Sequence, residues 1–184
     1  MMWNTHDSWG APAKLLHWTV AVLLFMQLAS GWLAVSWRLS PTKLDLFVWH
    51  KSTGMLILGL MIARVTWRVA NVVPSLPADM RPLERRTAHL SHLLLYLLLF
   101  LLPLTGWIVN SAANIPLRAF WLIPVPAIVE PDKTVAETAA RIHFVLFVLL
   151  SLGLILHIGA ALRHHYFKHD DVLVRMLPGA GRDR

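Results

Sequence analysis

The amino-acid sequence predicts an all-α integral membrane protein, a bundle of four helices that forms a single domain over residues 1–184. Four long apolar stretches, separated by polar connections, carry this prediction. Hydrophobic residues make up 57% of the chain and its mean hydropathy is +0.57, values typical of membrane proteins. Each stretch has about the 20 residues that a helix needs to cross a bilayer.

The first apolar stretch covers residues 15–37 and follows a short polar lead-in. His17 lies near its start, and Trp18 follows at the depth where aromatic residues favour the membrane interface. A secretory signal peptide is the alternative, but the apolar core of such a peptide spans only about 7 to 15 residues. We therefore interpret this stretch as a retained membrane-spanning helix.

The second stretch, residues 46–69, has His50 near its start. It ends with Arg64 and Arg68, which are four residues apart and so share a helical face. Gly54 lies one turn after His50. A residue without a side chain at this point would let a flat ligand approach the backbone, or would let two helices pack closely.

The third stretch, residues 88–109, contains Pro103, where we expect a kink. Its first turn carries His89 and His92, which are three residues apart and share a face. The connection that follows, residues 110–140, is rich in proline and contains adjacent aromatic residues. We expect this connection to lie partly at the membrane surface instead of crossing the membrane.

The fourth stretch, residues 141–163, contains His143 and His157 between the arginines at its ends. The two histidines are 14 residues apart, so they differ by about 40° in helical phase and by roughly 21 Å in height. One helical face therefore carries an imidazole near each membrane surface. Such an arrangement is typical of a helix that binds two metal centres, although a single histidine in the membrane can instead bond to a neighbouring backbone.

Composition excludes several classes of chemistry. The chain has no cysteine, which excludes disulfides, thiolate catalysis, iron–sulfur clusters and the covalent attachment of c-type haem. Any haem must therefore be of the b type. The formal net charge of +7 does not indicate nucleic-acid binding, because the sequence contains no nucleic-acid module and the bias of basic residues toward one membrane face explains the charge.

The alternation of four spans places both termini and the connection between the second and third spans on one side of the membrane. That side carries 11 of the 17 lysine and arginine residues, which predicts that both termini are cytoplasmic. His50 and His143 are then level with each other near the outer surface, and His17 and His157 lie near the inner surface. We therefore expect two pairs of histidines across the bundle.

Each expected pair suits haem better than zinc. A haem iron with two imidazole ligands needs them from opposite walls, whereas zinc needs three or four clustered ligands. We therefore predict two haem b groups, with the four paired histidines as axial ligands. His89 or His92 could replace a member of the inner pair, could hydrogen-bond a haem propionate or a quinone, or could face the membrane interface.

Short motifs, most of them centred on histidines, occur in all four apolar stretches and in the C-terminal tail. In chain order they are Leu16-His17-Trp18, His50-Lys51-Ser52-Thr53-Gly54 with Arg64 and Arg68, His89-Leu90-Ser91-His92, Pro103 with Gly106, His157, His164-His165-Tyr166-Phe167 and a tail from Asp170 to Pro178. In these motifs the chain resembles the bacterial cytochrome b561 family, four-helix membrane cytochromes with two haems. The resemblance covers nearly the whole chain. It implies that the haem ligands are His17, His50, His143 and His157.

The resemblance also implies a bacterial inner-membrane location and an activity. The best-known members resemble superoxide:ubiquinone oxidoreductases, which pass an electron from superoxide outside, through both haems, to a quinone near the inner side. Transferred residue by residue, this places His164 beside the quinone and makes His165 a further candidate, although both could instead contact lipid phosphate. Because both axial positions of each haem are filled, no substrate binds iron and no residue is assigned as catalytic.

Two other functions fit the sequence. The chain could be an electron-transfer subunit that links a periplasmic redox partner or dehydrogenase to the quinone pool, without activity of its own. It could also be a helical transporter without haem that uses its histidines for protons or metal ions. Superoxide-dependent reduction of quinone by the isolated protein favours the enzyme, and a colourless preparation favours the transporter.

Overall fold

The computed structural model describes residues 2–77 and 80–179. Its elements, in order, are α1 (Ala11–Ser36), α2 (Pro41–Val69), α3 (Pro82–Ala112), β1 (Leu117–Ala119), β2 (Ile123–Val125), α4 (Lys133–Arg163), the π-helix η1 (His164–Lys168) and the 3₁₀-helix η2 (Val174–Met176). Among the described residues, four helices are long and apolar enough to cross a membrane. The prediction of a membrane-spanning helical bundle is therefore confirmed.

Each helix is longer than the apolar stretch that predicted it, because polar residues extend the helix beyond the membrane core. Helix α4 shows this most clearly, since it begins at Lys133. The side chain of Asp132 caps this start by accepting a hydrogen bond from the Val135 N–H at 2.9 Å. A proline in the first turn begins α1, α2 and α3, at positions whose N–H would have no helical partner.

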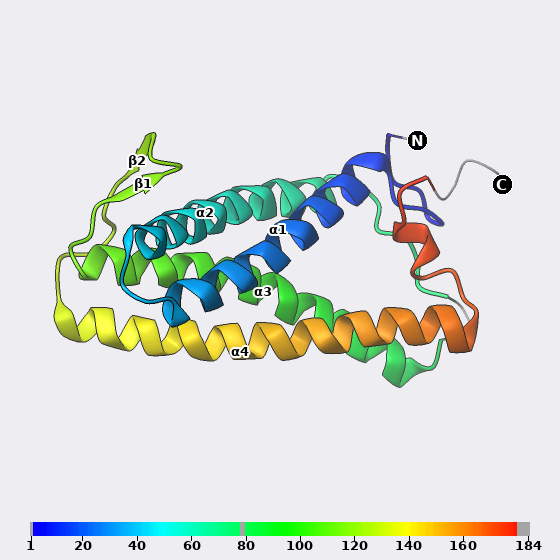
Figure 1. The fold of residues 1–184 in the computed structure, drawn as a ribbon. Coiled ribbons are helices and arrows are strands. Elements are labelled where there is room, and N and C mark those ends of the chain that lie inside the picture. The colour runs from blue at the N-terminus through cyan, green and yellow to red at the C-terminus, as the bar shows by residue number, and fades with distance from the viewer. Residues whose placement is uncertain (1, 78–79, 180–184) are drawn as a thin grey trace.

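The four helices run along one long axis, with both termini and the α2–α3 connection at one end (Figure 1). We call this the terminal end, and we call the opposite end, which carries β1 and β2, the hairpin end. Helix α1 packs mainly against α2, and α3 packs mainly against α4. The alternation predicted for the four spans is therefore present, with the N-terminus and the α4–η1 junction at the same end.

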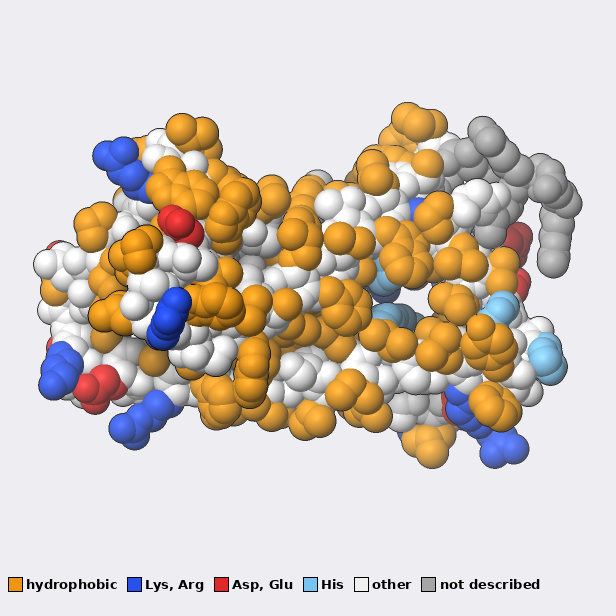
Figure 2. All heavy atoms as spheres, in the orientation of Figure 1, with side chains coloured by type: hydrophobic (Ala, Val, Ile, Leu, Met, Phe, Trp, Pro, Cys, Tyr) orange, Lys and Arg blue, Asp and Glu red, His pale blue; other side chains and the backbone are white. Residues whose placement is uncertain are grey.

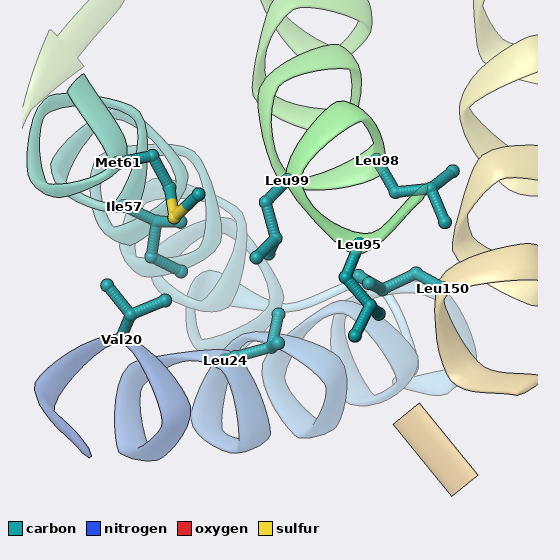
Figure 3. Packing of buried hydrophobic residues seen from close by; sticks show 8 residues of the cluster. All are labelled: Val20, Leu24, Ile57, Met61, Leu95, Leu98, Leu99 and Leu150. Atoms are coloured by element: carbon teal, nitrogen blue, oxygen red, sulfur yellow. The ribbon is translucent and has the colours of Figure 1, made fainter. Parts of the chain in front are cut away.

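The buried core is a small apolar cluster midway along the bundle, to which all four helices contribute (Figure 3). Its members are Val20, Leu24, Ile57, Met61, Leu95, Leu98, Leu99 and Leu150. Most other large apolar side chains of the helices face outward, and Figure 2 shows hydrophobic atoms across the middle of the face in view. Such a surface is expected of helices that contact lipid.

The connection between α3 and α4 departs from the all-α prediction. Strands β1 and β2 pair antiparallel, with Leu117 opposite Val125 and Ala119 opposite Ile123. These short strands, with prolines beside them, gave no alternating pattern long enough to predict a sheet from the sequence.

The C-terminal segment folds back over the terminal end. Lys14 donates a hydrogen bond to the Leu177 carbonyl oxygen at 3.1 Å, and Trp18 Nε1 donates to that of Met176 at 2.8 Å. Arg175 donates to the Ser75 carbonyl oxygen at 2.9 Å. The tail therefore connects the start of α1 to the α2–α3 connection.

Candidate functional site

Two histidines face each other across the bundle at the hairpin end. His50 comes from α2 and His143 from α4, and the centres of their rings are 6.4 Å apart. The rings are inclined by 75°. We call His50 and His143 the hairpin-end pair.

A hydroxyl group fixes the proton position on each ring of this pair. Ser30 Oγ lies 3.3 Å from His50 Nδ1 and donates its only hydrogen to the carbonyl oxygen three residues earlier. Thr105 Oγ1 lies 3.0 Å from His143 Nδ1 and does the same. With that hydrogen on the carbonyl, each hydroxyl oxygen accepts from an Nδ1–H, and in this tautomer the Nε2 lone pair of each histidine is free to bind a metal.

Two glycines make room for these rings. A Cβ atom at Gly31 would lie 2.7 Å from His50 Cε1, so no other residue fits there without displacing the ring. A Cβ atom at Gly106 would lie 3.3 Å from His143 Cε1. Gly106 is recognisable in the sequence only as part of a motif and Gly31 is not recognisable at all, because a glycine's neighbours on another helix leave no local signal.

An apolar cavity of about 440 Å³ surrounds the hairpin-end pair. All four helices line it, with side chains that include Trp32, Phe47, Met55, Trp107, Phe144 and Phe147. Gly54 also lines the cavity, and a Cβ atom there would lie 3.2 Å from the Gln27 amide nitrogen, so this glycine lets α1 and α2 pack closely. Lys51 contributes a half-buried amino group to the lining.

The terminal end contains a group of three histidines, which we call the terminal-end group. His17 of α1 and His157 of α4 have ring centres 6.5 Å apart, and His92 of α3 lies 5.4 Å from His157. His89 is exposed instead. Figure 2 shows an opening in this half of the molecule with histidine atoms at its rim. Within the described ranges, no cluster of three or more His, Cys, Asp or Glu residues has the arrangement of a metal-ion site.

Two arginines lie beside the terminal-end group. Arg64 Nη2 is 2.8 Å from His17 Nδ1, and its Nε donates to the Tyr96 hydroxyl at 3.1 Å. Arg68 stacks over Tyr96 and over Trp9, at 5.8 and 5.9 Å from the ring centres. Because a guanidinium group can only donate, His17 Nδ1 is the acceptor and the proton of a neutral His17 ring is on Nε2.

The spacing of both histidine pairs fits a haem iron. A metal–nitrogen bond is about 2 Å, and a ring centre lies roughly 1 Å further, so two rings on opposite sides of one metal have centres about 6 Å apart. The observed 6.4 and 6.5 Å agree with this value. The hairpin-end pair also has the required tautomer, whereas binding through His17 Nε2 requires Arg64 to leave Nδ1.

His164 and His165 lie in the π-helix η1 at the terminal end. His164 is buried and its Nδ1 is hydrogen-bonded to the Asp170 carboxylate, which also accepts from the Val172 N–H at 3.2 Å. The ring of His165 packs against that of Tyr166, with centres 4.8 Å apart. Sequence analysis did not pair Asp170 with His164, because the contact depends on the turn after η1.

Glu84 joins the α3 start to the end of the fourth span. Its carboxylate accepts from Lys168 at 2.6 Å and from Arg163 at 3.3 Å. Its other contact, with the Arg81 N–H, closes the first turn of α3. These contacts hold η1 and the entrance of α3 together beside the terminal-end group.

Comparison with known proteins agrees with this architecture. Residues 8–179 match the family described as prokaryotic cytochrome b561. The chain is 31% identical to "Cytochrome b561 homolog 2" of Escherichia coli (strain K12), over 98% of this chain and 96% of that protein. It is 29% identical to "Probable superoxide oxidase CybB" of Yersinia pestis, over 89% and 92%. It is 28% identical to "Cytochrome b561 homolog 1" of Escherichia coli (strain K12), over 89% and 93%.

Members of this family are membrane electron-transfer proteins with haem b. The four apolar helices and the match over nearly the whole chain lead to the same assignment. The chain therefore belongs to the prokaryotic cytochrome b561 family.

Proposed function

We propose that this protein carries electrons across a bacterial inner membrane from superoxide at the outer face to ubiquinone near the inner face. It does so with two haem b groups, one held by His50 and His143 and the other by His17 and His157. The observation that carries the proposal is the presence of two histidine pairs, with ring centres 6.4 and 6.5 Å apart, toward opposite ends of one bundle.

At the hairpin end the chain holds its cofactor through residues of all four helices. His50 and His143 would hold it, and Ser30 and Thr105, beside their Nδ1 atoms, would keep the Nε2 atoms unprotonated. The bound haem supplies reversible one-electron chemistry at its iron. Because His50 and His143 would supply both ligands to its iron, the donor would react by outer-sphere electron transfer without binding the iron.

The core between the two sites excludes water. Leu24, Leu98, Leu99 and Leu150 are buried there. Helix α4 crosses this layer and carries one histidine of each pair, at levels roughly 21 Å apart from the rise per residue.

The donor side carries basic residues that favour an anion. Lys51 lines the cavity itself, and Arg118 and Arg141 are exposed at the same end. Positive potential raises the local concentration of an anionic donor such as superoxide. The relative from Yersinia pestis, named a probable superoxide oxidase, supports this donor.

The acceptor side carries the His164–Asp170 pair. The carboxylate fixes the orientation of the ring through Nδ1, so Nε2 is the atom that can donate a proton to a reduced quinone oxygen. His165 is a further candidate for the quinone contact. The presence of 11 of the 17 basic residues on the side of the termini supports a cytoplasmic location for this end.

The haem count tests the ligand assignment. We expect purified wild-type protein to contain two haem b groups, by pyridine haemochrome assay and difference spectrum, and His143→Ala and His157→Ala each to retain about one. His89→Ala, at an exposed histidine, is the matched control and keeps both. Variants at His143 or His157 that retain both haems would overturn the assignment.

Superoxide-dependent reduction of ubiquinone tests the activity. The protein in lipid vesicles, with its haems in place, should reduce ubiquinone when superoxide is generated outside. The same haem content with electron transfer only after addition of a partner protein would instead identify an electron-transfer subunit.

A further inference from the structure

The loop of the hairpin and the strand after it present apolar side chains to the surroundings. Residues 119–129 contain no charged side chain. Trp121, Leu122 and Ile123 are 44%, 79% and 63% exposed. A loop in water rarely exposes three adjacent large apolar residues, whereas tryptophan and aliphatic residues are favoured where a membrane meets water.

This loop is held in one orientation by α2. Phe120 and Trp121 both have left-handed backbone conformations, with φ of 49° and 62°. The Phe120 N–H donates to Ser52 Oγ at 2.7 Å, and Ser52 is completely buried. The Trp49 ring makes edge contacts with the rings of Phe120 and Trp121, with centres 5.8 and 5.5 Å apart. The exposed side chains are therefore presented by a fixed backbone.

The direction of the hairpin relative to the helices matches a membrane surface. In Figure 1, β1 and β2 turn away from the long axis of the bundle at the end where α2 begins. Because the helices cross the bilayer, a segment that projects sideways at their ends lies at the level of the lipid headgroups. Trp49, which packs against the loop, is itself half exposed on α2, so the apolar loop continues the lipid-facing surface of that helix.

The charge pattern also favours lipid. Arg118 is exposed on β1 between two buried residues, Leu117 and Ala119. A long basic side chain beside an apolar tip can reach a lipid phosphate while the tip enters the acyl region.

We propose that residues 117–125 form an interfacial anchor, with Trp121, Leu122 and Ile123 inserted into the lipid leaflet at the hairpin end. The anchor acts on the haem-binding residues through two contacts. Leu117, at its base, lines the cavity around the hairpin-end pair. Ser52, which holds its tip, lies two residues after His50. Lipid contact thereby steadies the wall of this cavity.

Because the chain has no cysteine, single labels can test the anchor. Leu122→Cys carries an environment-sensitive fluorophore, and the haem-containing protein is placed in vesicles of phosphatidylethanolamine and phosphatidylglycerol. We expect blue-shifted emission, strong quenching by lipids with a nitroxide near the headgroup, and little quenching by iodide. Glu130→Cys, just beyond the uncharged segment and exposed, is the matched control and should be quenched by iodide.

Equal quenching by iodide at both positions, without quenching by nitroxide lipids, would overturn the proposal. Shielding of Leu122→Cys from both quenchers would also overturn it, because a protein surface or a second copy of the chain would then cover the tip. Ile123→Cys gives a second reading at the same tip if the first variant loses haem. The haem count of each labelled protein verifies its fold, so this test is independent of the donor and acceptor.

Discussion

The two histidine sites have almost the same ring spacing but different polar neighbours. At the hairpin end, hydroxyl oxygens accept from both rings, and the surrounding cavity is apolar apart from Lys51 and Gln27. At the terminal end, a guanidinium donates to His17, and a third histidine and a second arginine lie close by. One helix, α4, contributes a ligand candidate to each site, so the difference comes from the other three helices.

This difference indicates distinct roles for the neighbouring side chains. We expect the hydroxyls at the hairpin end to prepare the imidazoles to bind metal. The arginines at the terminal end supply positive charge that can pair with haem propionates and favour the reduced haem. We therefore expect the terminal-end haem to have the higher midpoint potential, which would direct electrons away from the outer face.

The largest expected effect is the loss of haem from the hairpin-end site alone. Gly31→Val should abolish haem binding there and leave about one haem per chain, because even a Cβ atom at this position would lie 2.7 Å from the His50 ring. The pyridine haemochrome count measures this loss. Gly59→Val, in α2 with no atom within 4 Å of a Cβ, should retain both haems. Retention of two haems in Gly31→Val would show that His50 has room to move.

The next largest effect is expected from the hydroxyl group that sets the tautomer of His143 at the same site. Thr105→Val removes the acceptor for His143 Nδ1–H and should weaken haem binding at the hairpin end by about 10- to 100-fold. The rate of haem transfer to apomyoglobin reports this change. Thr105→Ser keeps the hydroxyl and should behave like wild type. Equal rates for the valine and serine variants would contradict the role assigned to the hydroxyl.

A smaller effect is expected on the midpoint potential of the terminal-end haem, because arginine side chains lie beside that site. Arg64→Gln should lower the midpoint potential of the terminal-end haem by up to about 60 mV, a tenfold change in the equilibrium constant of a one-electron couple. Removal of a nearby cation destabilises the more electron-rich, reduced form. A spectroscopic redox titration resolves the two haems. Arg118→Gln, at the other end, should leave this potential unchanged, and an unchanged value in Arg64→Gln would remove the basis for the contrast.

The smallest expected effect concerns the acceptor. Asp170→Asn should slow quinone reduction by up to about tenfold, because His164 loses the partner that orients its ring. The haem count and both potentials should stay as in wild type, which separates this effect from damage to the bundle. Stopped-flow oxidation of the reduced protein by a ubiquinone analogue measures it. A slower rate accompanied by loss of a haem would point to a structural role instead.

The sequence by itself determined the four spans and the level of each histidine. Long apolar stretches predict membrane helices because the bilayer requires that length. Helical periodicity places His143 and His157 on one face, and the alternation of spans places His50 level with His143 and His17 level with His157. The structure brings these residues together in the expected pairs, while their role as haem ligands stays a prediction.

Only the tertiary structure decided which side chains lie beside those histidines. Ser30 and His50 are 20 residues apart, Thr105 and His143 are 38 apart, and His17 and Arg64 are 47 apart. It also separated His92, which lies against His157, from the exposed His89. Periodicity fixes the depth and face of a residue on its own helix, but lateral neighbours depend on how helices pack, which side chains far apart in the chain determine together.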